Sequence, residues 1–211
     1  MGNLDLITII IIAANVIISY KGFNDYAFFD AYKFNIGGVQ RGEKLRMFSS
    51  GFLHVDTQHL LFNMLTLYFF AGIVINELDV FGFLTIYVSS LIFGNLLTLY
   101  FHKTEYHYSA VGASGAVMGV IYSAILFDPW MEINFFIPGF VFGIGYLLYS
   151  IYGMKNKVGN IGHDAHFGGA IGGYVTTLIL SPSLFKTDLL FVCLLLIPII
   201  LLFILKKAGK I

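Results

Sequence analysis

Two polar side chains with complementary chemistry lie in short glycine-rich segments, each at the beginning of a long apolar stretch. Ser114 belongs to GASG at 112–115, and His166 belongs to AHFGG at 165–169. A serine hydroxyl becomes a nucleophile when a base removes its proton, and a histidine with an ordinary pKa of about 6.5 does this near neutral pH. Polar groups are costly at membrane depth unless they have a use. The pair therefore predicts nucleophilic catalysis, with Ser114 as nucleophile and His166 as base.

A second pair of polar residues fits the charge that such a reaction would create. Attack on a carbonyl produces an oxyanion, which needs hydrogen-bond donors held in place. His59 and Asn63 are four residues apart, so a helix would present both on one face. With the backbone N–H of Ser114 at a helix N-terminus, they are suited to supply those donors. A plain packing role for His59 and Asn63 is the alternative.

The composition is that of an integral membrane protein. Of the 211 residues, 58% are hydrophobic and 11% are charged, and the mean hydropathy is +0.83, whereas soluble domains carry about 25% charged residues. The formal net charge is zero and no run of Lys and Arg occurs, so nucleic-acid binding is not expected. The single cysteine, Cys193, excludes a disulfide framework and a cysteine-based zinc site. We expect one multi-pass membrane domain over 1–211, in the cell membrane.

Apolar windows long enough to cross a bilayer recur along the chain. The predicted fold is therefore an all-α polytopic helix bundle, with short connections that favour antiparallel neighbours. If every window spans the membrane, the second, fourth and sixth begin on one face, which brings the polar residues named above to a similar depth. The long connection at 21–58 is rich in basic and aromatic residues and is expected at the interface. The predicted spans are 4–20, 59–75, 82–101, 111–127, 133–153, 166–180 and 189–205.

Glycines recur at intervals of four in two of these spans. Such small-xxx-small patterns let helix backbones approach closely in a membrane, and they occur at Gly115 and Gly119 and again at Gly169 and Gly173. His166 would lie on the same helix face as the second pair of glycines. We predict that these glycines pack the fourth span against the sixth and bring the serine and the histidine within reach of each other.

Three motifs, in this order, resemble those of the rhomboid family of intramembrane serine proteases. The motifs are HVDTQHLLFN at 54–63, GASG at 112–115 and AHFGGAIGG at 165–173. The resemblance covers about 46–173. It implies a rhomboid-like core of six transmembrane helices, here 1–182. The last span and its basic tail, 183–211, resemble the additional C-terminal transmembrane helix that part of the family carries.

The resemblance also implies how the site residues act. Ser114 and His166 would form a catalytic dyad without a third acid. The Ser114 amide, His59 and Asn63 would form the oxyanion hole. Neither a metal ion nor a cofactor is implied, and the substrates would be transmembrane proteins cut within or near their segments in the lipid bilayer. Some family members stack a tyrosine on the histidine from four residues after the serine, but this chain has Met118 there. What orients His166 therefore stays open.

Two other functions stay open on the sequence alone. One is a catalytically inactive rhomboid-like module that binds membrane proteins, although such relatives typically lack the serine or the histidine. The other is a metal transporter or metalloenzyme, with ligands among His54, His59, His163, Asp164 and His166. Asp164 is two residues before His166, so a helix would point it to a different face. His54 and His163 are expected to be loop or interfacial residues.

The distribution of charged residues and the family resemblance predict opposite orientations in the membrane. Of the 12 Lys and Arg residues, all except Lys186 lie on the predicted active face, which the positive-inside rule places in the cytosol. The family resemblance implies the opposite, with the active face away from the cytosol. The sequence predicts neither the physiological substrate nor the oligomeric state.

Overall fold

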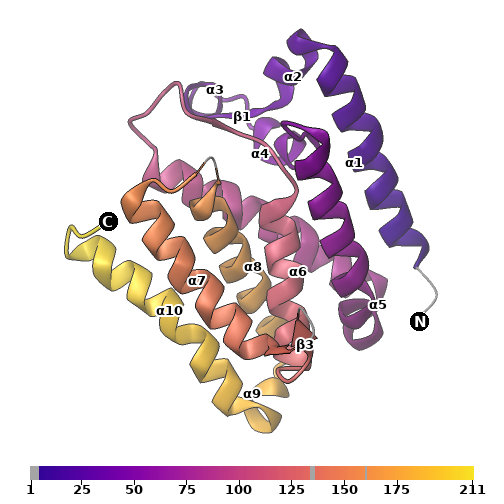
Figure 1. The fold of residues 1–211 in the computed structure, drawn as a ribbon, viewed down its shortest axis with the longest axis vertical. Helices are drawn as coiled ribbons and strands as arrows, with labels where there is room; N and C mark the ends of the chain where they lie inside the picture. The colour runs from indigo at the N-terminus through magenta and orange to yellow at the C-terminus, as the bar shows by residue number, and fades with distance from the viewer. Residues whose placement is uncertain (1–4, 134–135, 160) are drawn as a thin grey trace.

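The computed structural model describes residues 5–133, 136–159 and 161–211, which form an α-helical bundle (Figure 1). Its main helices are α1 (Leu6–Asn24), α5 (Thr57–Phe101), α6 (Ser114–Phe127), α7 (Gly139–Asn156), α8 (His163–Leu180) and α10 (Leu189–Lys207). Among the described helices, α1, α5 and α10 are long and apolar enough to cross a membrane, and α6 is a shorter apolar helix. The predicted all-α polytopic bundle is confirmed.

α5 contains two of the predicted spans, joined by a sharp turn. The backbone leaves the helical region at Asp79, where φ is 60° and ψ is −175°. Asp79 Oδ1 accepts hydrogen bonds from the N–H groups of Phe81 at 2.7 Å and Gly82 at 3.0 Å, as the cap at a helix N-terminus does. The spans 59–75 and 82–101 are therefore two helical segments connected without a loop.

Two helices begin elsewhere than predicted, because hydropathy alone does not show where a helix is capped or interrupted. α8 begins at His163, one turn before His166. α7 begins at Gly139, later than predicted, because β3 (Glu132–Ile133) and β4 (Ile137–Pro138) form an antiparallel pair before it. The helix at α8 is thus longer than the predicted span, whereas the strand pair replaces the first residues of the span predicted at 133–153.

α1 and α6 also differ from their predicted ranges at one end. α1 continues one turn further than predicted, to Asn24, while Leu4, where we placed its beginning, lies outside the described residues. α6 begins at Ser114 and not at Val111. The cause is the backbone at Gly112, whose φ of +129° is incompatible with a helix. Ser114 consequently lies at a helix end.

The connection between the first two spans is more ordered than the interfacial loop we expected. It contains α2 (Tyr26–Tyr32), β1 (Phe34–Asn35), α3 (Ile36–Gln40), α4 (Arg46–Ser49) and a 3-10 turn at Ser50–Phe52. β1 pairs antiparallel with β2 (Ser109–Ala110), so the connection is hydrogen-bonded to the segment that leads into Ser114. The guanidinium of Arg46 donates to the carbonyls of Asp30 at 2.7 Å and Lys33 at 2.9 Å, which ties this connection together.

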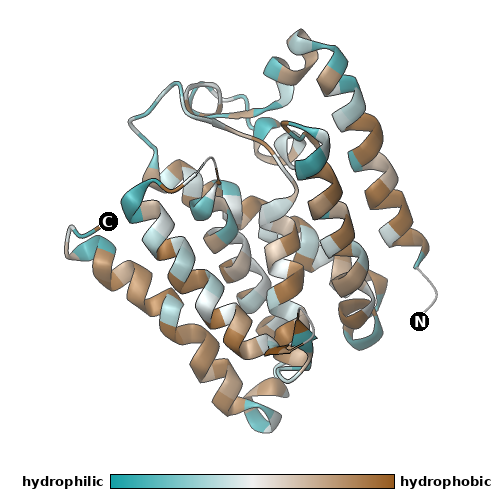
Figure 2. Cartoon of the chain, viewed as in Figure 1, coloured by the Kyte–Doolittle hydropathy of each residue, from teal (hydrophilic) through white to brown (hydrophobic). Residues whose placement is uncertain are grey.

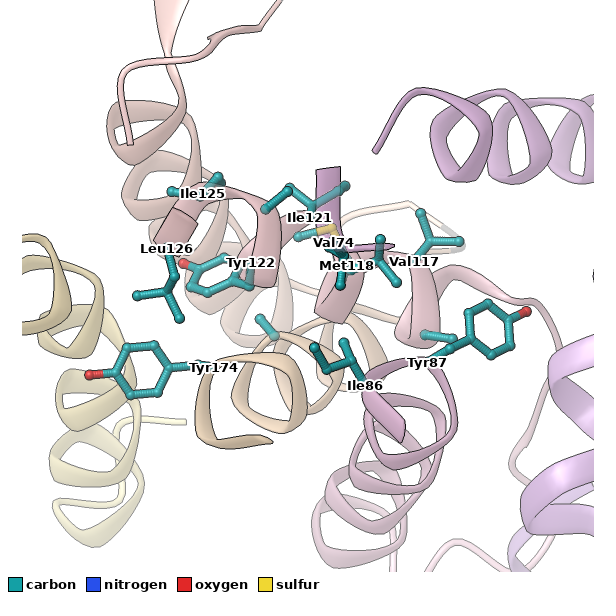
Figure 3. Close-up of a cluster of buried hydrophobic side chains, with 14 of the residues drawn as sticks. Val74, Ile86, Tyr87, Val117, Met118, Ile121, Tyr122, Ile125, Leu126 and Tyr174 are labelled. Carbon is teal, nitrogen blue, oxygen red and sulfur yellow. The ribbon is translucent and has the colours of Figure 1, made fainter. Parts of the chain in front are cut away.

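α6 is the central helix of the bundle. All of its residues between the two terminal ones are buried, and a helix that is apolar on every side needs neighbours on every side. It contacts α5, α7 and α8. Figure 3 shows Met118, Ile121 and Tyr122 of α6 within the cluster of buried apolar side chains. Figure 2 shows that hydrophilic residues gather at the helix ends and in the connections, as a membrane environment requires.

The glycines of α6 and α8 lie where these two helices touch. A Cβ atom added at Gly169 would overlap the backbone of Gly115, and one added at Gly173 would overlap the backbone of Gly119. The obstructing atoms belong to the main chain, so they cannot rotate away as a flexible side chain would. We call this contact, made through these four glycines, the α6–α8 seam. It has no room for any side chain.

His54 lies in the connection before α5, as expected of a loop residue, but it is fully buried. Its Nδ1 lies 2.9 Å from Ser19 Oγ of α1, and its Nε2 accepts the backbone N–H of Ala113 at 3.4 Å. Burial, reinforced by the nearby His59, lowers the pKa of His54 to about 3, so the ring is neutral in the folded protein. His54 therefore links α1 to the turn before α6.

We expect Gly169→Ala to destabilise the bundle, because its methyl group has no space in the α6–α8 seam. Overpacking of this kind typically costs about 1–3 kcal/mol, so the melting temperature in detergent should fall by several degrees. Gly72→Ala in α5 is the matched control, since no atom lies within 4 Å of the added Cβ. It should leave the melting temperature unchanged or slightly raised. A Gly169→Ala protein as stable as wild type would show that the α6–α8 seam has space for a methyl group.

We also expect acid to destabilise the protein through His54. The unfolded histidine, with a pKa of 6.5, takes up a proton as the pH falls, whereas the folded one stays neutral until about pH 3, so stability decreases across that window. The loss at about pH 5 is about 2 kcal/mol relative to neutral pH. His54→Asn should show a smaller drop in melting temperature between these two conditions than wild type.

His107→Asn is the control for the acid experiment, because His107 is exposed. It should lose as much stability on acidification as wild type does. If His54→Asn and His107→Asn respond to acid alike, the buried neutral state of His54 does not govern the response.

Candidate active site

A cavity of about 810 Å³ lies at the end of the bundle where α6 and α8 begin. Ser114 of α6, His59 of α5 and His166 of α8 all border it. The remaining wall comes largely from 101–112 and 153–165. Three residues that the sequence singled out from separate parts of the chain therefore meet at one cavity.

A glycine turn leads into Ser114 and shapes the space beside it. Gly112 has a φ of +129°, a left-handed conformation that favours glycine, and its N–H donates to the Ser50 carbonyl at 3.0 Å. A Cβ atom at Gly112 would lie 2.7 Å from the His59 ring and 3.7 Å from Ser114 Oγ. Any side chain at this position would therefore fill the space between the hydroxyl and the imidazole of His59.

The backbone at Ser114 favours negative charge. Ser114 is the first residue of α6, and the preceding cap residue, Ala113, makes no side-chain hydrogen bond to the helix. The N–H groups of the first turn have no partner within the helix, and the helix dipole is positive at this end. These groups are suited to hold an oxyanion that forms next to the serine hydroxyl.

His166 lies in the first turn of α8, where close backbone contacts hold the chain. A Cβ atom at Gly94 of α5 would lie 2.7 Å from the carbonyl oxygen of Ala165, and one at Gly115 of α6 would lie 3.2 Å from the same oxygen. The start of α8 is thus fixed against two helices. His166 Nδ1 lies 2.6 Å from the hydroxyl of Tyr146, and no hydrogen bond among the described residues involves Nε2 of this histidine, which borders the cavity.

Tyr146 is the site residue that sequence reasoning missed. It belongs to α7, and no spacing in the sequence connects it to a histidine on the next helix. The one feature of the sequence that could have indicated Tyr146 is its polar hydroxyl within an apolar, glycine-rich span. Met118, at the position where some family members have a tyrosine, is 5% exposed and belongs to the hydrophobic core. The tyrosine that contacts His166 therefore comes from α7 and not from α6.

Two parts of the predicted site are not assembled. Among the described residues, no hydrogen bond joins Ser114 to His166, although both border the cavity. The amide of Asn63 donates to the His59 carbonyl at 2.9 Å, and Asn63 is not among the described residues that line the cavity. Catalytic hydrogen bonds are often long without a ligand and tighten when a substrate binds. The structure thus brings Ser114 and His166 to one cavity without a hydrogen bond between them among the described residues.

The other polar residues near His166 face different partners. Asp164 Oδ2 lies 3.5 Å from His102 Nε2 at the end of α5, so the carboxylate contacts His102 and not His166, as helix geometry predicts. His163 opens α8 and is buried, contrary to the loop position we expected, and its Nε2 lies 3.1 Å from the Val158 carbonyl. In the described ranges, no group of three or more His, Cys, Asp or Glu side chains could hold a metal ion.

Tyr108 forms part of the cavity wall outside the helices. Its ring stacks on His102, with ring centroids 3.7 Å apart and an angle of 14° between the planes. Burial raises the pKa of Tyr108, and the carboxylates of Asp164 and Glu105 raise it further, so the phenol is uncharged at neutral pH. Tyr108 itself therefore adds a polar group but no charge to the wall.

The sequence is similar to that of known proteins. A rhomboid domain model matches residues 41–183. RHOMBOID-like protein 12, mitochondrial, of Arabidopsis thaliana is 24% identical over 81% of this chain and 56% of its own length. Rhomboid protease GluP of Bacillus subtilis is 29% identical over 68% of this chain and 27% of its own length. Putative rhomboid protease YdcA of the same organism is 37% identical over 39% of this chain and 41% of its own length.

The chain spans little more than half the length of RHOMBOID-like protein 12 and less of the two bacterial relatives. The matched range, 41–183, nevertheless includes α5, α6, α7 and α8 and with them Ser114, His59 and His166. It covers well over half of the 211 residues. This apolar helical chain is an integral membrane protein and belongs to the rhomboid family.

Proposed function

We propose that this protein is a serine endopeptidase that hydrolyses peptide bonds within or near the transmembrane segments of other membrane proteins. The observation that carries the proposal is that Ser114 and His166 border one cavity from two helices, with Ser114 at a helix N-terminus. Membership of a family with relatives named rhomboid protease supports it.

The proposed reaction uses Ser114 and His166 in turn. Ser114 Oγ attacks the carbonyl carbon of the scissile bond while His166 Nε2 takes its proton, and the imidazolium then returns that proton to the leaving amine. This produces an acyl-enzyme. A water molecule, deprotonated by the same nitrogen, attacks the ester carbonyl and releases the carboxylic acid and the serine.

The oxyanion in this reaction takes its hydrogen bonds from the Ser114 N–H and the His59 imidazole. The His59 ring lies beside the space at Gly112, and so does the Ser114 hydroxyl next to which the oxyanion forms. Asn63 contributes a third donor when its amide turns from the His59 carbonyl, to which it donates in the resting geometry. Donors that are already in place cost no reorganisation during the reaction, which makes them effective.

The substrate in this proposal is a membrane segment that unwinds locally, because a helical peptide bond is shielded from attack. The cavity of about 810 Å³ has a partly polar lining, including Ser109, His59 and Tyr108, that suits the water needed for hydrolysis. A location in the cell membrane is also our proposal, since the named relatives include mitochondrial as well as bacterial proteins.

A binding module without catalysis is the second candidate. It is favoured by the resting geometry, in which no described hydrogen bond joins Ser114 to His166 and the Asn63 amide bonds to its own helix. Such a module would hold membrane proteins at the same cavity. It would not cut them, so the variants below separate the two candidates.

Ser114→Ala and His166→Ala should each abolish cleavage of a transmembrane substrate in proteoliposomes. The two residues act as a unit, so the double variant should be no worse than either single one. Ser123→Ala is the matched control, because Ser123 is a buried serine of the same helix that does not line the cavity. It should keep wild-type activity. Cleavage at the wild-type rate by Ser114→Ala would end the serine-protease proposal.

His59→Ala should lower kcat by about 100-fold with little change in KM, because it removes one oxyanion donor. Asn63→Ala should lower kcat less, because its amide must first leave the His59 carbonyl. Asn156→Ala is the control, since the Asn156 amide also donates to a carbonyl four residues earlier but on an exposed surface. If His59→Ala and Asn63→Ala both keep full kcat, they are packing residues.

A further inference from the structure

The imidazole of His166 has a partner on a helix that the dyad itself does not use. Tyr146 of α7 places its hydroxyl oxygen 2.6 Å from His166 Nδ1. We propose that Tyr146 is the positioning residue of His166: its oxygen accepts the Nδ1–H and thereby keeps Nε2 unprotonated toward Ser114. The proposal rests on the proposed function, because only a catalytic base needs a fixed tautomer.

The contact is a hydrogen bond and not a stacking interaction. A separation of 2.6 Å is short for a bond between nitrogen and oxygen. The two ring centroids are 6.0 Å apart and the planes are tilted by 32°, so the rings meet through the hydroxyl at the edge. A hydrogen bond to the tyrosine hydroxyl fixes which ring nitrogen of His166 faces Tyr146, whereas stacking would leave the imidazole ring free to flip.

The direction of this hydrogen bond decides whether His166 can act as a base. If the tyrosine donated to Nδ1, the neutral imidazole would carry its proton on Nε2, which could then take nothing from Ser114. If the oxygen of Tyr146 accepts from Nδ1–H, Nε2 has a free lone pair. The imidazolium formed during the reaction also donates from Nδ1, so the same contact stabilises it. The reactive form of the site therefore has the tyrosine as acceptor.

Tyrosine in this role adds a dipole and no charge. A phenol with an ordinary pKa of about 10 stays neutral at physiological pH, so Tyr146 orients the imidazole without the charge stabilisation that a carboxylate gives. Asp164, the nearest carboxylate in sequence, is turned to His102 instead. Loss of Tyr146 should consequently cost less than loss of the aspartate in a Ser-His-Asp triad.

Other contacts hold Tyr146 in place relative to His166. The ring of Phe142, one turn earlier on α7, lies nearly parallel to that of Tyr146, with centroids 5.8 Å apart. Further along α7, a Cβ atom at Gly153 would overlap the ring of His163, so this histidine packs directly on the α7 backbone. α7 and α8 thus contact each other at Tyr146 and at Gly153, about two turns apart on α7. These two contacts fix the position of the Tyr146 hydroxyl along α8.

Tyr146→Phe tests the proposal, because it removes the oxygen and keeps the ring. We expect kcat to fall by about 10- to 100-fold with KM changed less than about twofold. The melting temperature in detergent should stay near that of wild type. Tyr149→Phe is the matched control: it is one turn away on α7, and its ring contacts His163 and not His166. It should keep wild-type kcat.

A second readout does not depend on activity. Nitrogen-15 NMR of protein labelled at histidine distinguishes Nδ1–H from Nε2–H, and the signal of His166 is the one lost in His166→Ala. Wild type should show His166 protonated on Nδ1, and Tyr146→Phe should show a mixture of tautomers, while Tyr149→Phe should resemble wild type.

The two readouts separate the failure of the proposal from the failure of the proposed function. If wild-type protein cleaves nothing and a changed tautomer appears in Tyr146→Phe, the serine-protease function fails and the positioning by Tyr146 holds. If Tyr146→Phe keeps both wild-type kcat and the wild-type tautomer, Tyr146 does not position His166. A His166 that carries its proton on Nε2 in active wild type would likewise overturn the proposal.

Discussion

The close approach of the α6 and α8 backbones is the constraint on which the rest of the structure depends. Glycines on both sides of the α6–α8 seam leave no Cβ atom between the helices. Because membrane helices lack a strong hydrophobic drive to associate, such close van der Waals contact is a main source of their specificity. Ser114 precedes the first glycine of the seam on α6, and His166 precedes the first on α8. The seam therefore determines how near the two side chains lie.

The site at the end of this seam depends on segments outside the two helices. β1 pairs with β2 just before α6, and His54 joins α1 to the backbone at Ala113. On the other side, α7 meets His166 through Tyr146. The serine is thus fixed by the connection after the first span, and the histidine by the neighbouring helix. The serine and the histidine therefore have separate supports, although both lie near one end of the same seam.

The sequence was sufficient for those features that follow from local pattern. Hydropathy located the helices, and the spacing of Gly169 and Gly173 indicated a packing face. The sequence was insufficient for features that depend on backbone conformation or on contacts between distant segments. The predicted spans 59–75 and 82–101 leave a break between them, but they do not show that Asp79 turns the chain without a loop. The burial of His54 depends on segments far away in the chain. Tyr146 meets His166 only because α7 and α8 pack together, which no residue spacing encodes.

In the proposed reaction, Ser114 is a nucleophile activated by His166. The most direct test is to treat the purified protein in detergent with a fluorophosphonate and to map the adduct by peptide mass spectrometry. We expect one adduct, on Ser114, that forms far more slowly when His166 is replaced by alanine. An unmodified Ser114, or an adduct that forms at the same rate without the histidine, would rule out these roles for the two residues.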